Sequence, residues 1–135
     1  MSDAPGFEIE LALEGEAAVH RVTDALKEEG FGVLTRIDLD QAFSEKLGID
    51  FRPYAILGAC NPTLAHRALT ARPEVGLLLP CNVTVESTAE GGSLVRIIDP
   101  DAMLGVGALA SDPDIQAVAR EARARLERVA ETLSA

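Results

Sequence analysis

The two cysteines are the residues of this chain whose type and placement most directly suggest chemistry. Each stands directly before an asparagine near an apolar run, in GACNP at 58–62 and in LPCNV at 79–83. A thiolate can act as a nucleophile, as a redox group or as a ligand of a soft ion such as Cu(I). The spacing fits no C-x-x-C pattern and there is no matching histidine pair, so a structural zinc site is not predicted.

Cys60 precedes a strong helix start. Asn61 is a favourable N-cap residue, and Pro62 is favourable at the first helical position. The positive end of the helix dipole would lower the pKa of the Cys60 thiol and raise its reactivity. The alternative is that Cys60 is a small apolar side chain at the end of a buried strand.

Cys81 follows Pro80, and no helix start comes after it, so its asparagine needs another explanation. Asn82 could donate a hydrogen bond to a ligand, or it could satisfy backbone groups that Pro80 leaves open. If the strand ending in Cys60 lies beside the strand that contains Cys81, both thiols and both asparagines lie towards the same end of the sheet. The predicted ligand-binding residues are therefore Cys60, Asn61, Cys81 and Asn82.

Hydrophobic periodicity predicts the elements that would position these residues. Strands are expected over residues 7–13, 31–37, 53–60, 75–86 and 94–99. Helices are expected between Gly15 and Gly30, between Asp38 and Gly48, between Asn61 and Pro73, and after Pro113. Gly30 suits a left-handed C-cap, with Phe31 available for the hydrophobic contact that often follows. The last helix carries an apolar stripe at spacings of three and four: Ile115, Val118, Ala122, Leu126, Val129 and Leu133. Alternation of polar and apolar residues favours an α+β fold, a single-layer, mostly antiparallel sheet of about five strands with helices packed on one face. A parallel βαβ unit over 53–85 stays open because a helix joins those two strands.

Several local signals define the helix ends. Asp38 with Gln41 resembles a capping box, and Phe43 belongs to the apolar face of the short helix that follows. Asp99-Pro100 and Asp112-Pro113 repeat the pattern of a cap followed by proline. Residues 105–110, GVGALA, are expected to form a flexible connection.

Composition and charge limit the function classes. The 135 residues are 47% hydrophobic with 25% charged, which predicts a single globular domain over 1–135. The formal net charge of −10 makes nucleic acid and anionic membranes unfavourable partners. No apolar run reaches the length of a membrane span, and the first residues do not resemble a signal peptide. A cytoplasmic protein with free thiols is therefore expected.

Three segments carry a family resemblance: YAILGACNPTLAHRAL, then VGLLLPCNVTV, then VRIIDPDAML. In this order they resemble the bacterial and archaeal family called domain of unknown function 302. The resemblance implies a compact α+β domain with an antiparallel sheet, distantly similar to the TATA-binding-protein arrangement and often dimeric, and it implies no activity. The family pattern falls on Gly58, Cys60, Asn61, Pro62, Pro80, Cys81, Asn82, Asp99, Pro100 and Met103.

Three functions follow as hypotheses from these residues. The first is a homodimeric binding protein for a small ligand or a soft metal, with a pocket where GACNP and LPCNV meet the last helix. The second is a thiol-dependent redox enzyme that uses Cys60 with Cys81 as the resolving thiol. The third is a purely structural dimer in which both cysteines only pack.

Overall fold

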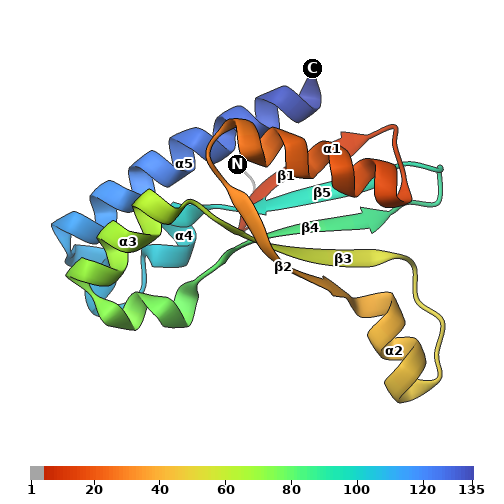
Figure 1. Ribbon diagram of the computed structural model, residues 1–135, viewed down its shortest axis with the longest axis horizontal. Coiled ribbons are helices and arrows are strands. Elements are labelled where there is room, and N and C mark those ends of the chain that lie inside the picture. Colours follow the sequence, from red (N-terminus) through yellow and green to blue (C-terminus); the bar gives the residue numbers. More distant parts are fainter. Residues whose placement is uncertain (1–4) are drawn as a thin grey trace.

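The computed structural model describes residues 5–135 and arranges them around one five-stranded sheet (Figure 1). The strands lie in the order β1-β5-β4-β3-β2, and each neighbouring pair within the described residues is antiparallel. Their bounds are β1 Gly6–Leu11, β2 Gly32–Asp38, β3 Tyr54–Cys60, β4 Cys81–Ser87 and β5 Ser93–Ile98. The predicted α+β class with an antiparallel sheet is confirmed, and the parallel βαβ alternative over 53–85 is wrong.

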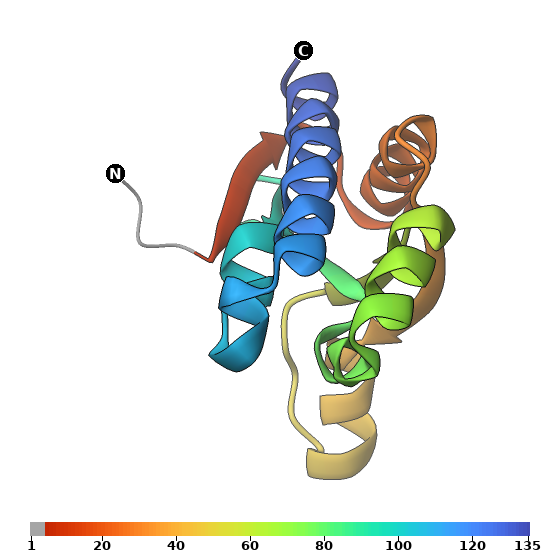
Figure 2. The ribbon, with the colours of Figure 1, turned by 90° about the vertical axis from the view of Figure 1, so that its left-hand side faces the viewer.

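The helices that pack on the sheet lie on one of its faces, as the sequence predicts (Figures 1 and 2). The helical elements are α1 Gly15–Glu28, α2 Leu39–Leu47, α3 Pro62–Ala71, α4 Pro100–Leu104 and α5 Pro113–Ser134, with 3-10 turns at Pro73–Leu78 and Gly107–Ser111. Within residues 5–135, no helix has both the length and the apolar character that crossing a membrane requires.

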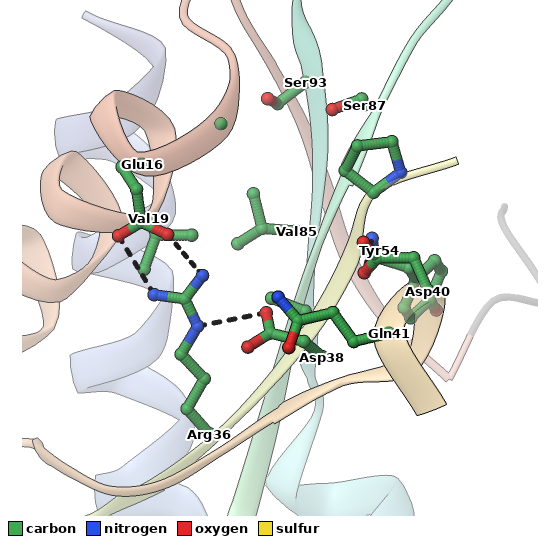
Figure 3. A pocket seen from close by; sticks show the side chains of 13 residues that line it. Glu16, Val19, Arg36, Asp38, Asp40, Gln41, Tyr54, Val85, Ser87 and Ser93 are labelled. Carbon is green, nitrogen blue, oxygen red and sulfur yellow. Dashed lines mark hydrogen bonds and ion pairs between the residues drawn. The ribbon is translucent and has the colours of Figure 1, made fainter. Parts of the chain in front are cut away.

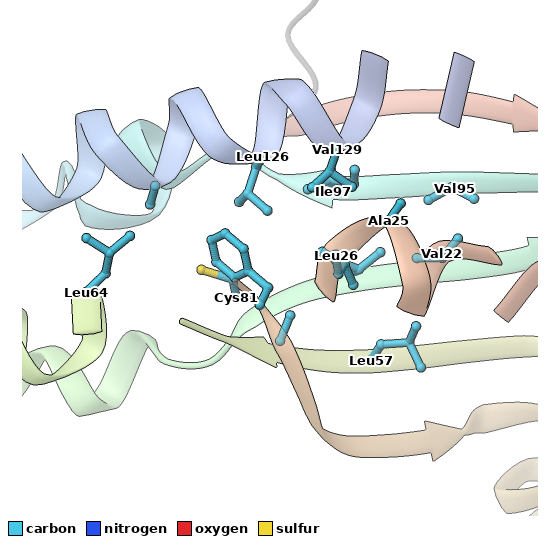
Figure 4. Close-up of a cluster of buried hydrophobic side chains, with 14 of the residues drawn as sticks. Val22, Ala25, Leu26, Leu57, Leu64, Cys81, Val95, Ile97, Leu126 and Val129 are labelled. Carbon is cyan, nitrogen blue, oxygen red and sulfur yellow. The ribbon is translucent and has the colours of Figure 1, made fainter. Parts of the chain in front are cut away.

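The core lies between the sheet and the long helix α5 (Figure 4). The predicted apolar stripe of α5 is buried at every position: Ile115, Val118, Ala122, Leu126, Val129 and Leu133. The same core contains strand residues that are wholly inaccessible, among them Leu57, Val83 and Ile97. Each such side chain contributes about 1.5–3 kcal/mol by its burial, so this layer dominates the stability of the fold.

Helix α1 ends in a Schellman motif, which the sequence signals with Gly30. Gly30 has a φ of 83°, and its N–H donates to the Lys27 carbonyl. The N–H of Phe31 donates to the Leu26 carbonyl at 3.0 Å. This reversal turns Phe31 inward, where only 2% of its surface is exposed.

The strand expected over 75–86 begins late, at Cys81. Residues Pro73–Leu78 form a 3-10 helix instead, in which Val75 is buried and Leu77 is 88% exposed. A short apolar run has no period that separates a strand from a helical turn. Pro73 and Pro80, which flank the run, have no N–H to give to a ladder, so the run does not join the sheet.

The surroundings of α2 also differ from expectation. Asp38 occupies the N-cap position, but its side chain makes no capping bond; its Oδ1 accepts from Arg36 Nε at 3.2 Å instead. None of residues 39–47 is buried, and Phe43 packs edge-on against Phe51 at 5.2 Å between ring centroids. Helix α2 therefore extends away from the body of the protein (Figure 1). The connection at 105–110 is likewise ordered as a 3-10 turn, Gly107–Ser111.

The other face of the sheet carries a row of ion pairs. The buried Glu86 on β4 accepts a hydrogen bond through Oε2 from Arg52 Nε at 2.5 Å. It also forms an ion pair with Arg96 on β5. Arg96 Nε in turn lies 2.9 Å from Glu8 Oε2 on β1. We call this side the open face, because the pairing register places its side chains opposite those that meet the helices.

Candidate functional site

Strands β3 and β4 bring the two cysteines to one end of the sheet. Cys60 is the last residue of β3, Cys81 is the first of β4, and the register sets Ala59 directly opposite Cys81. Because the strands are antiparallel neighbours, the end of one meets the start of the other. Both cysteines are free thiols; Cys60 is partly exposed and Cys81 is buried (Figure 4).

Both cysteines line one small cavity of about 40 Å³. Asn61 and Met103 line it as well, and α5 contributes Val118 and Ala122. The remaining lining residues are apolar: Phe31, Ala59, Leu64, Ala65, Leu79, Pro80, Pro100 and Leu104. The sequence places a pocket where GACNP and LPCNV meet the last helix, and the structure contains a cavity at that place. We call it the sulfur cavity.

Asn61 shapes the wall of the sulfur cavity through its capping role. Its Oδ1 accepts from Leu64 N at 3.1 Å, as predicted for the N-cap of α3, and the residue is 8% exposed. A Cβ on Gly30 would lie 2.9 Å from Asn61 Nδ2, so the Schellman turn and the cap pack directly on each other. Asn61 is thus placed by two helix ends that are remote in sequence.

Asn82 does not line the sulfur cavity. It pairs with Gly58 across the strands, and the alternation of a strand turns its side chain to the open face. There it borders a separate hollow of about 220 Å³ together with Thr84, Arg96 and Ile98. The two Cys-Asn pairs therefore place their asparagines in different surroundings.

Burial raises the pKa of both thiols. The pKa of Cys60 lies above its usual value because of desolvation. Desolvation, with added repulsion from Cys60, raises the pKa of Cys81 to about 11. The expectation that the helix dipole would lower the pKa of Cys60 is therefore wrong, because the loss of water around the sulfur outweighs it. Both sulfurs are protonated at neutral pH.

The lining of the sulfur cavity also restricts its chemistry. Among the described residues that form it, none is a His, Asp, Glu, Lys or Arg. His66, one turn into α3, is exposed and lies outside the lining. Without a neighbouring base, neither thiol has a group to take up its proton. The arrangement suits a ligand that itself displaces the protons, as a soft metal ion does.

A second cavity, of about 220 Å³, opens at the other end of the strands (Figure 3). Most of the charged side chains that line this cavity are paired with other groups of the protein. Arg36 Nη1 donates to Glu16 Oε2 at 3.0 Å, Arg36 Nε donates to Asp38 Oδ1, and Asp40 Oδ1 accepts from Tyr54 N at 3.2 Å. These contacts attach α1 and the start of α2 to β2 and β3. Periodicity gives no sign of this cavity, because it depends on how the helices meet the sheet.

Fold and cavity together define an α+β domain in which an antiparallel sheet, helix-covered on one face, holds two thiols at one end. The model of the family described as domain of unknown function DUF302 matches residues 7–133, and the chain belongs to that family. Among solved structures, it is similar to the crystal structure of an uncharacterized conserved protein DUF302 from Bacillus stearothermophilus. The two share 28% identity with a TM-score of 0.83, over 96% of this chain and 98% of the other. No protein with a curated description matched the chain.

Proposed function

We propose that this protein binds one soft metal ion, Cu(I), in the sulfur cavity, with Cys60 and Cys81 as thiolate ligands. The observation that carries the proposal is that cysteines from two different strands line one small cavity. Soft thiolate ligands favour Cu(I), which is stable with few sulfur ligands. Zinc and calcium need more ligands, and no three His, Cys, Asp or Glu side chains among residues 5–135 are grouped to hold a metal ion.

The size of the cavity favours an ion over an organic ligand. Small-molecule sites typically enclose roughly 300–1,000 Å³, whereas the sulfur cavity has about 40 Å³. That volume has room for a single ion, and apart from Asn61 and the three sulfur-containing residues the lining side chains carry no polar group. The partial exposure of Cys60 offers an entry route.

Metal binding here would release protons. Each thiol loses its proton as its sulfur–copper bond forms, so two protons leave for each Cu(I) bound. Because burial raises the pKa of both thiols, their protons compete with the metal throughout the neutral range. The apparent affinity should therefore rise with pH, by up to roughly a hundredfold per pH unit for two released protons.

The test is an anaerobic titration with Cu(I) against a chromogenic Cu(I) chelator. The wild-type protein should bind one ion per chain, and Cys60→Ser and Cys81→Ser should each lose most of that affinity. Asn82→Ala is the matched control, because Asn82 follows a cysteine but faces the open side of the sheet, and it should keep the wild-type affinity. A wild-type protein that takes no Cu(I) from the chelator would contradict the proposal and favour cysteines that only pack.

The redox hypothesis has less support. A resolving pair needs an activated thiolate, whereas both thiols have a raised pKa and no base lines the cavity. A thiol held protonated in apolar surroundings is a poor nucleophile. The same surroundings are compatible with a buried metal ligand, whose proton the metal displaces.

We also propose that the protein is a homodimer joined through the open face. The row Arg52, Glu86, Arg96 and Glu8 alternates in sign across that face. A two-fold axis through the middle of the row sets Glu8 against Arg52 of a second copy, and Glu86 against Arg96. Isologous dimers require such self-complementary surfaces. Tyr54, Ile56, Leu94 and Ile98 add apolar area on the same face.

A further inference from the structure

We infer that Met103 is the third sulfur ligand of the site and that the short helix α4 serves to hold it there. This inference rests on the Cu(I) binding proposed above. Met103 lines the sulfur cavity together with Cys60 and Cys81, although it lies more than twenty residues beyond Cys81 in the chain. Within the described residues, no other methionine is present.

Helix α4 is fastened at its start. Asp99 caps it, with Oδ1 accepting from Asp101 N at 2.9 Å and its carbonyl accepting from Met103 N at 3.0 Å. The other carboxylate oxygen of Asp99 binds Arg123 on α5. Pro100, the first residue of α4, is almost fully buried. These contacts set the beginning of α4 against the middle of α5.

Helix α4 is also fastened at its end. Leu104, 2% exposed, enters the core directly after Met103. Gln116 on α5 donates from Nε2 to the Leu104 carbonyl at 3.2 Å and to the Leu109 carbonyl at 2.9 Å. A helix of five residues is not stable by itself, so tertiary contacts at both ends determine its place. Of the three residues between Pro100 and Leu104, Met103 is the one that lines the sulfur cavity.

The chemistry of a thioether fits this position. It is soft and neutral, so it adds a Cu(I) ligand without adding charge to an apolar cavity. It carries no proton, so its binding releases none. Two thiolates and one thioether favour Cu(I) over Zn(II), which takes four harder or anionic ligands in structural sites. The inference therefore also predicts metal selectivity.

The first experiment uses the wild-type fold. The protein is produced with selenomethionine, loaded with Cu(I) under anaerobic conditions and studied by X-ray absorption at the selenium and copper edges. A copper–selenium scattering path is expected, and it should be missing in selenomethionine-labelled Met103→Leu, where Met1 is the remaining selenium. A wild-type spectrum with bound Cu(I) and no copper–selenium path overturns the inference.

The second experiment measures affinity. Met103→Leu nearly conserves volume, so the fold should be kept. Its Cu(I) affinity in the chelator competition should fall at least roughly tenfold, since even outer-shell changes cost ten- to a hundredfold. The pH dependence of binding should keep the wild-type slope, because the same two protons leave. An unchanged affinity in Met103→Leu overturns the role of Met103 alone, whereas wild-type protein that binds no Cu(I) overturns the proposed function as well.

Discussion

The two Cys-Asn pairs illustrate how the same dipeptide can have different roles. In the first pair, Asn61 caps α3 and packs against Gly30, while Cys60 is one of the residues that line the sulfur cavity. In the second pair, Cys81 opens β4 on the core side, and Asn82 falls on the opposite face because successive strand residues alternate. Helix capping explains one asparagine, and strand pleating separates the other from its cysteine.

The buried Cys81 thiol should make the stability of the protein fall at alkaline pH. Its pKa rises from about 9 to about 11 on folding, so in that range the unfolded chain loses the proton and the folded chain keeps it. Stability is thus fully present below pH 9 and is lost as the pH rises towards 11, by about 2 kcal/mol for this group.

Urea unfolding of wild type and Cys81→Ala, with reductant present, checks this from pH 7.5 to 10.5. The difference in the free energy of unfolding between wild type and Cys81→Ala should become smaller as the pH rises. Cys60→Ala is the control. The Cys60 thiol is more exposed than that of Cys81, so removing it should change the pH dependence of the free energy of unfolding less. Parallel profiles for wild type and Cys81→Ala would show that the thiol is not desolvated in the folded state.

At the scale of elements, Gly58 determines how β3 meets its surroundings. A Cβ at this position would lie 2.2 Å from Thr35 Oγ1 on β2 and 2.8 Å from Pro80 Cγ before β4. Any side chain must therefore push apart the segments that lead into the sulfur cavity. Gly32 on β2 provides a comparison, since a Cβ there would meet no atom within 4 Å.

Gly58→Ala should lower the free energy of unfolding by about 1–3 kcal/mol, the usual cost of overpacking. Gly32→Ala should change it by less than about 1 kcal/mol, and could raise it by restricting the unfolded chain. Chemical denaturation of wild type and of the two variants measures these changes in the free energy of unfolding. Equal stabilities for the two variants would mean that Thr35 and Pro80 can move aside without cost.

At the scale of the whole molecule, the asymmetry of the sheet is the main feature. One face is covered by α1 and α5, and the other carries the alternating ion pairs (Figure 2). Burial alone would raise the pKa of Glu86, but hydrogen bonds from Arg96 and Arg52 outweigh it and hold that pKa below its usual value. These charges therefore persist through the neutral range, in which the proposed dimer would form.

If the open face joins two copies, Ile56→Lys should produce monomers. Ile56 lies on that face on strand β3, between Ile37 on β2 and Thr84 on β4. A lysine there would place two like charges within a dimer interface, while a monomer could leave its ammonium in water. Analytical ultracentrifugation over a range of protein concentrations measures the shift from dimer to monomer.

Leu77→Lys is the matched control for this prediction. Leu77 is 88% exposed on the 3-10 turn Pro73–Leu78, outside the strands that form the open face, so this variant should sediment like wild type. A wild-type protein that is monomeric at all concentrations, or an Ile56→Lys variant that still dimerises, would exclude the open face as the interface.

Local patterns in the sequence predict most of the helices and strands, and they predict the part of the site that Asn61 forms as a helix cap. The stripe of α5, the Schellman end of α1 and the Asn61 cap depend on neighbours within a few residues, and each is found as predicted. The sequence predicts a strand at residues 75–80, but a short apolar run carries no period that separates a strand from a helical turn. Tertiary packing and two prolines place Pro73–Leu78 in a 3-10 turn instead.

The sequence by itself determined the fold class, the helix ends and the place of Cys60 at the end of a strand, because these depend on short-range periodicity and capping. The tertiary structure shortened the strand expected over 75–86, so that Cys81 is the first residue of β4. Only the tertiary structure decided that Cys60 and Cys81 share a cavity, that Met103 joins them and that Asn82 does not. It also decided the protonation of the thiols, which depends on how many remote side chains exclude water from the sulfurs. Strand register and desolvation are long-range properties, so no local pattern along the chain encodes them.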